Sequence, residues 1–119
     1  MKTILVVDDE PELRGIVIEV LADPGWMAIG AADAYEALRI LAERRIDLLI
    51  TDVKMPGMNG FQLARQAKLM LPALLVIYIS GYYARTEQSD GPTFGRLIRK
   101  PFRTAELLRE IECQLAGPL

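Results

Sequence analysis

The chain has 119 residues, of which 51% are hydrophobic and 25% charged, and we expect residues 1–119 to form one globular α/β domain. A net charge of −2 argues against direct nucleic-acid binding, the absence of histidine excludes histidine ligands and bases, and the single cysteine, Cys113, excludes an internal disulfide. No apolar run approaches the ~20 residues of a membrane span, so we expect a cytoplasmic protein without a membrane partner.

Five short apolar runs alternate with helical patterns along the chain. We expect strands over residues 3–7, 26–31, 46–51, 74–79 and 96–99. Apolar residues at helical spacing follow Pro11, Asp33, Asn59 and Thr104, each of which is a residue favoured at the start of a helix. Alternating strands and helices with short links predict a doubly wound fold with a parallel sheet.

Polar residues follow four of the five predicted strands. Asp8 and Asp9 come after the first, Asp52 after the third, Ser80 after the fourth and Lys100 after the fifth. The carboxyl ends of parallel strands lie at one edge of the sheet, so these side chains should meet in one pocket. Three crowded carboxylates need a counter-charge, which Mg²⁺ and a lysine can supply. Such a site suits phosphoryl transfer, with an aspartate as nucleophile.

Four motifs together resemble the receiver domain of two-component response regulators. They are Asp8-Asp9, the stretch Thr51–Gly60, Ser80-Gly81 and Lys100-Pro101-Phe102, and the resemblance covers essentially the whole chain. It implies a flavodoxin-like five-stranded parallel sheet in the order 2-1-3-4-5 with five helices. The chain ends after the last predicted helix, so we expect a stand-alone receiver like those of chemotaxis, with no effector domain attached.

The resemblance also assigns roles to the acids. Asp52 is implied to be the phosphoacceptor. The Asp9 and Asp52 carboxylates and the backbone carbonyl of Lys54 would bind Mg²⁺, and Asp8 would act through the metal's water shell. These assignments are implied by the family and rest on the position of each residue in its motif.

Two further residues are implied to bind the phosphoryl group. Lys100 would pair with its oxygens, with the Lys100–Pro101 peptide bond cis so that the ammonium points into the pocket. The Ser80 hydroxyl would turn inward to the new acceptor and so pass the signal on. The family usually has an aromatic residue three positions before the lysine, where this chain has Leu97. The output mechanism is therefore expected to depart from the usual one.

The stretch from Tyr82 to Gly95 lacks helical periodicity and contains Gly91-Pro92. We expect the fourth helix to be short, irregular or absent there. This stretch is also predicted to be the least ordered part of the free domain and to become ordered when a phosphoryl group binds.

The expected function is a phosphorylation-controlled signalling switch that catalyses only its own phosphorylation and dephosphorylation. The implied donor is a histidine kinase or a histidine phosphotransfer protein, and the downstream target is a protein that the sequence does not identify. Two alternatives remain open at this point. One is a degenerate receiver that binds partners without being phosphorylated. The other is a Mg²⁺-dependent phosphohydrolase, which would need an acid two residues after Asp52, where this chain has Lys54.

Overall fold

The computed structural model of the protein describes residues 1–22, 25–81 and 94–116. Its strands are β1 (Thr3–Val7), β2 (Met27–Ala31), β3 (Leu48–Asp52), β4 (Leu75–Ser80) and β5 (Gly95–Arg99). Its helices are α1 (Pro11–Ala22), α2 (Ala34–Glu43), α3 (Gly60–Met70) and α4 (Thr104–Ala116). None of the helices in these ranges combines the length and apolar character needed to cross a membrane.

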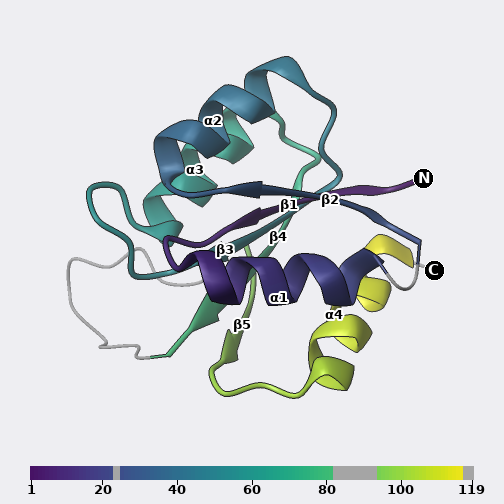
Figure 1. Cartoon of the computed structure of the whole chain (residues 1–119). Helices are drawn as coiled ribbons and strands as arrows, with labels where there is room; N and C mark the ends of the chain where they lie inside the picture. The colour runs from purple at the N-terminus through teal and green to yellow at the C-terminus, as the bar shows by residue number, and fades with distance from the viewer. Residues whose placement is uncertain (23–24, 82–93, 117–119) are drawn as a thin grey trace.

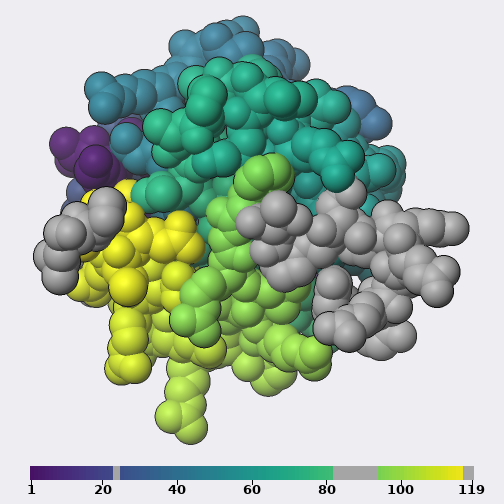
Figure 2. Space-filling model, turned by 180° about the vertical axis from the view of Figure 1, so that it is seen from behind, coloured from purple at the N-terminus to yellow at the C-terminus, as the bar shows by residue number. Residues whose placement is uncertain are grey.

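The five strands form one parallel sheet in the order β2-β1-β3-β4-β5, as expected. Helices α1 and α4 cover one face of this sheet, and α2 and α3 cover the other (Figure 1). Seen from behind, β5 reaches the surface between the teal segment that includes α3 and the yellow α4 (Figure 2). Because the strands are parallel, their carboxyl ends lie at one edge of the sheet.

The sheet divides the core into two layers. On the α2–α3 face the buried residues include two aromatic side chains, Phe61 and Tyr78, whose rings meet edge to face at 5.0 Å between centroids. On the α1–α4 face the fully or nearly fully buried residues are aliphatic. Strand β3 is buried along its whole length, which explains why its sequence is a continuous apolar run with no polar alternation.

The observed element boundaries differ from the predicted ones in a few places. Strand β3 begins two residues later and includes Asp52, which pairs with Ile79, and β4 includes Ser80. Strand β5 begins one residue earlier, at Gly95. Four helices lie within the described residues. The additional helix expected between β4 and β5, and the predicted low order of that stretch, fall on residues 82–93, which lie outside the described residues.

Candidate functional site

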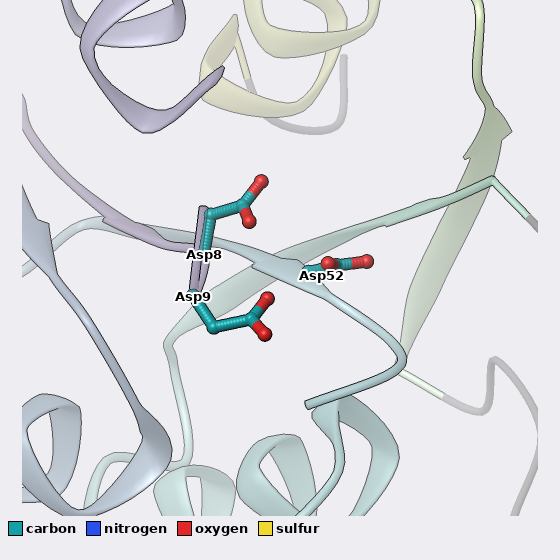
Figure 3. Close-up of side chains that lie close together, drawn as sticks. All are labelled: Asp8, Asp9 and Asp52. Carbon is teal, nitrogen blue, oxygen red and sulfur yellow. The ribbon is translucent and has the colours of Figure 1, made fainter. Parts of the chain in front are cut away.

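Three carboxylates meet at the carboxyl edge of the sheet. Asp8 and Asp9 follow β1 directly, and Asp52 ends β3, which lies beside β1. One oxygen from each carboxylate lies within 4.8 Å of the other two (Figure 3). Asp8 and Asp52 are buried, at 5% and 6% exposure, whereas Asp9 is exposed. The parallel register of two adjacent strands thus brings together three acids from two separate parts of the chain.

Asp8 is held by hydrogen bonds from three sides. Its backbone N–H donates to the carbonyl of Ala31 in β2 at 3.2 Å. The Glu10 N–H donates to its Oδ1 at 2.9 Å, and the Arg14 guanidinium donates from Nη1 to its backbone carbonyl at 2.7 Å. The first acid of the pair is therefore fixed in position by β2 and by the start of α1.

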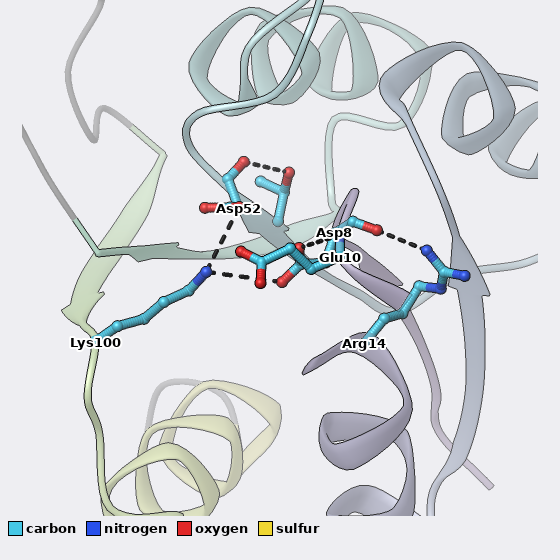
Figure 4. A network of polar contacts seen from close by, with 6 residues as sticks. Asp8, Glu10, Arg14, Asp52 and Lys100 are labelled. Carbon is cyan, nitrogen blue, oxygen red and sulfur yellow. Dashed lines mark hydrogen bonds and ion pairs between the residues drawn. The ribbon is translucent and has the colours of Figure 1, made fainter. Parts of the chain in front are cut away.

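Lys100 supplies the positive charge at this edge. Its Nζ lies 3.5 Å from Oδ2 of Asp52 and 3.8 Å from Oδ2 of Asp8 (Figure 4). Its backbone N–H donates to the carbonyl of Ser80 at 2.9 Å, which continues the β4–β5 pairing beyond the strands. The Lys100–Pro101 peptide bond is cis, the geometry that the resemblance implies. The ammonium therefore lies beside both buried carboxylates, where it can contact an anion bound at this edge of the sheet.

The buried carboxylates have altered acidity. Burial raises the pKa of Asp52 to about 6, against the lowering effect of Lys100 and with a further increase from the charges of Asp8 and Asp9. Burial also raises the pKa of Asp8, although the hydrogen bond from Glu10 and the Lys100 charge lower it. Near neutral pH Asp52 is thus mostly ionised but held at a free-energy cost that a bound cation would relieve.

Two of the three acids, Asp9 and Asp52, open onto a pocket of about 590 Å³. It is lined by Asp9, Glu10, Asp52, Lys54, Met55, Pro56, Gly81 and Lys100. The donor set fits Mg²⁺, which prefers hard oxygen ligands and keeps several waters in its shell. The pocket also has room for those waters beside a phosphoryl-sized anion. Lys54, two residues after Asp52, thus lines the pocket.

The loop after Asp52 is built to turn tightly back over the end of β3. The N–H of Gly60 donates to the Val53 carbonyl at 2.8 Å. A Cβ at Gly60 would lie 2.2 Å from the Asp52 carbonyl oxygen, so only glycine fits there. Asn59 caps α3, and its side chain and that of Gln62 bond each other's backbone N–H groups. These contacts fix the backbone on which Asp52 and Lys54 are carried.

The sequence pattern of the response regulator receiver domain matches residues 4–112. The chain belongs to this family. Its members are generally signalling switches of two-component systems, and the acid cluster at the carboxyl edge of the sheet fits that class.

Individual relatives resemble the chain over nearly its whole length. The response regulator receiver protein CpdR of Brucella abortus is 35% identical over 120 residues, covering 97% of this chain and 98% of CpdR. A response regulator receiver protein from Sinorhizobium medicae superimposes with a TM-score of 0.88 at 30% identity, covering 98% and 95% of the two chains. The response regulator TrrA from Thermotoga maritima, crystallised with Mg²⁺ and BeF, has a TM-score of 0.82 at 30% identity, covering 95% and 98%.

Ser80, which is expected to pass the signal on, and Leu97, which stands where the family usually has an aromatic residue, lie on β4 and β5. Ser80 is buried at the end of β4, next to β3. Leu97 pairs with Tyr78 and packs, half-buried, against the α2–α3 core. The aromatic ring that the family usually carries on β5 is replaced here by leucine, while a buried tyrosine stands beside it on β4. The strand pairing makes this arrangement visible, and the sequence alone does not.

Three further residues at the site were not singled out from the sequence. Glu10 lines the pocket, and its N–H binds Asp8. Gly60 makes the close approach to Asp52. Arg14 could have been found from its position in the sequence. A cation near the first turn of a helix opposes the helix dipole, which suggests that it has a specific partner.

Proposed function

We propose that the protein is a phosphorylation-controlled switch that accepts a phosphoryl group on Asp52 with the help of Mg²⁺. The observation that carries this proposal is the cluster of three carboxylates within 4.8 Å, with the Lys100 ammonium 3.5 Å from Asp52, at an open pocket. Burying acids this close together is costly, and such an arrangement is typical of a functional site, here one that would bind a metal ion and an anion.

Asp9, Asp52 and the backbone carbonyl of Lys54 would hold the ion, with Asp8 acting through its water shell. Bound Mg²⁺ would neutralise the carboxylates and the incoming phosphoryl oxygens. The Mg²⁺–BeF complex of the similar receiver TrrA supports this choice of ion. Within this chain, burial fixes Asp8 and Asp52, while the exposed Asp9 stays accessible to an ion from solvent.

The proposed reaction is transfer from a phosphohistidine. A carboxylate oxygen of Asp52 attacks phosphorus, the phosphorus–nitrogen bond breaks, and its electron pair stays on the donor imidazole, which leaves as the neutral ring once protonated. Asp52 must be ionised to attack, and with a pKa of about 6 it is so at neutral pH. The Lys100 ammonium, next to that carboxylate, would pair with the transferred oxygens.

The donor would be a histidine kinase or a histidine phosphotransfer protein, and the output would be binding to another protein. The Ser80 hydroxyl would contact the new phosphoryl group and so couple Asp52 to the β4–β5 edge. We further propose that residues 1–119 act as one receiver domain in the cytoplasm, without direct nucleic-acid contact and without turning over a free substrate.

Intact mass measurement after incubation with acetyl phosphate and Mg²⁺ tests this function. We expect a gain of one phosphoryl group, lost in Asp52→Asn and lost when EDTA removes the metal. Asp47→Asn is the matched control, because Asp47 lies just before the opposite end of the same strand and binds the Thr3 N–H. Labelling that persists in Asp52→Asn would refute the assignment. Failure of the intact protein to be labelled would instead favour a receiver that only binds partners.

A further inference from the structure

Arg14 contacts the peptide bond that joins the two acids after β1. Its Nη1 donates to the Asp8 carbonyl oxygen at 2.7 Å, and this carbonyl belongs to the Asp8–Asp9 peptide (Figure 4). A charged donor at this distance makes one of the stronger kinds of hydrogen bond. The contact therefore fixes the orientation of the peptide plane from which the Asp9 side chain departs.

Gly30 in β2 provides the space that Arg14 occupies. A Cβ at Gly30 would lie 3.2 Å from Cδ of Arg14, 3.4 Å from its Nε and 3.0 Å from Cδ1 of Ile18. The described glycines with positive φ are Gly25 and Gly57, so the conformation of Gly30 is open to any residue. Glycine weakens a strand interior and usually marks a close approach. Here the approaching group is the stem of Arg14.

The position of Arg14 on its helix needs this explanation. It is the fourth residue of α1, near the positive end of the helix dipole, where acids such as Glu12 are favoured and cations are not. Lysine and arginine are ordinarily placed at the other end of a helix. A specific contact, here the one to the Asp8 carbonyl, offsets the unfavourable position.

We propose that Arg14 is a positioning residue that holds the Asp8–Asp9 peptide so that both carboxylates stay beside Asp52, at the proposed metal site. With Arg14 in place, the N–H, the carbonyl and the carboxylate of Asp8 all have partners, in Ala31, Arg14 and Glu10. Of these bonds, only the one from Arg14 holds the Asp8 carbonyl to α1. Without it, the Asp8–Asp9 peptide plane would be free to rotate. The inference rests on the proposed function, since it concerns the acids assigned to Mg²⁺.

The sign of the effect on Mg²⁺ affinity separates positioning from simple charge. Removing a nearby positive charge would by itself strengthen the binding of a cation. Loss of the fixed peptide would weaken it, and loss of a partner that orients a metal ligand typically costs 10-fold or more in affinity. Arg14→Met keeps much of the stem and removes the donor, so we expect the Mg²⁺ dissociation constant to rise about 10-fold.

The experiment is a Mg²⁺ titration of the full chain, in which binding is measured by calorimetry and by the shifts of the amide NMR signals. Arg14→Lys should recover part of the affinity, because it keeps one donor on a flexible stem. Gly30→Ala should also weaken binding, by displacing the Arg14 stem with every charge left in place. Arg44→Met is the matched control, because Arg44 follows α2 and contacts Met27 at the amino edge of the sheet. We expect it to leave the affinity unchanged.

An unchanged or tighter Mg²⁺ affinity in Arg14→Met overturns the proposal, provided that its NMR spectrum shows a folded chain. Weakened binding in Arg14→Met but not in Gly30→Ala overturns the role given to Gly30. If the unmodified chain binds no Mg²⁺, the proposed function has failed and not merely this inference. If the unmodified chain and Arg14→Met bind equally and are labelled equally by acetyl phosphate, only the inference has failed.

Discussion

Two aspartates lie at the two ends of strand β3 and have opposite surroundings. Asp47, just before the strand, accepts a hydrogen bond from the Thr3 N–H at 2.9 Å and lies 3.9 Å from the Arg45 guanidinium. Asp52, the last residue of the strand, lies among two other acids with Lys100 as its nearby cation. The first carboxylate ties β3 to the start of β1. The second is buried at a cost that a ligand would relieve.

The difference shows how one strand serves both stability and chemistry. At the amino edge the carboxylate is used by the fold itself, since its hydrogen bond joins neighbouring strands. At the carboxyl edge the fold gathers like charges, which lowers stability, and a bound cation would offset this cost. Removing the carboxylate at each end should therefore have opposite effects on stability. Three predictions concern, in turn, the backbone at the carboxyl end, the two carboxylates, and the acidity of Asp52.

The largest effect on stability is expected for Gly60→Ala, because the added methyl group would clash with the backbone at the carboxyl end of β3. The new methyl group would lie 2.2 Å from the Asp52 carbonyl oxygen, and that clash can be relieved only by moving the backbone. We expect the free energy of unfolding, measured in urea, to fall by about 3 kcal/mol. Phosphoryl acceptance should fall with it, because the loop that carries Lys54 would move.

Gly15→Ala is the control for this prediction. Gly15 lies on the exposed side of α1 with nothing within 4 Å of an added Cβ, so alanine should stabilise the helix by about 0.5–1 kcal/mol. Equal unfolding free energies for the two alanine variants would mean that the close approach at Gly60 is absent in solution.

The second prediction concerns the charges themselves, at pH 7.5 without divalent ions. The pKa of Asp52 is about 6 in the folded chain and near 3.8 when unfolded, so between these values the folded state binds more protons. Stability therefore falls as pH rises through this window, and the cost remains above it. This difference corresponds to about 3 kcal/mol. Asp52→Asn removes the charge but still buries an amide, so it should raise the free energy of unfolding by about 2 kcal/mol.

The matched change at the other end should act in the opposite direction. Asp47→Asn replaces a charged acceptor for the Thr3 N–H with a weaker neutral one, so the free energy of unfolding should fall by about 1 kcal/mol. Chemical denaturation of both variants at pH 7.5 and at pH 4 gives the comparison. The gain in Asp52→Asn should shrink at pH 4, and a loss of stability in that variant at pH 7.5 would contradict the contrast.

The smallest expected effect is a change in the pKa of Asp52. In metal-free protein, the Asp52 carboxyl carbon observed by NMR should titrate near pH 6. Lys100→Met should raise this pKa further, because the Lys100 ammonium lowers it in the intact chain, and Mg²⁺ should lower it. An Arg44→Met variant should titrate like the unmodified protein. Titration of Asp52 at its ordinary acidic value would show that the carboxylate is solvated and not buried.

Local patterns and one topological rule predict a parallel sheet and the meeting of the acids, whereas the strand order is implied by the resemblance to the receiver family. Continuous apolar runs identify buried parallel strands, and Asp8, Asp52 and Lys100 each stand where such a run stops. Strand ends are less predictable. Whether Asp52 belongs to β3 depends on its pairing with Ile79 in another strand, and no pattern within β3 contains that information.

Contacts between distant segments are the part that the sequence does not predict. The hydrogen bond from the Thr3 N–H to Asp47 and the packing of Arg14 on Gly30 join residues whose spacing follows no helical or strand period. The pairing of Tyr78 with Leu97 is of the same kind. Each depends on the relative placement of two elements to within an ångström or so, which the packing of the whole domain decides.

The order of the site residues along the chain has a consequence for synthesis. Asp8 comes from the first strand, Asp52 from the central one and Lys100 from the loop after the last. A nascent chain that still lacks β5 would contain the three acids without the ammonium that partly offsets their charge. Under the proposed function, the site would therefore be complete only once nearly the whole domain has been synthesised.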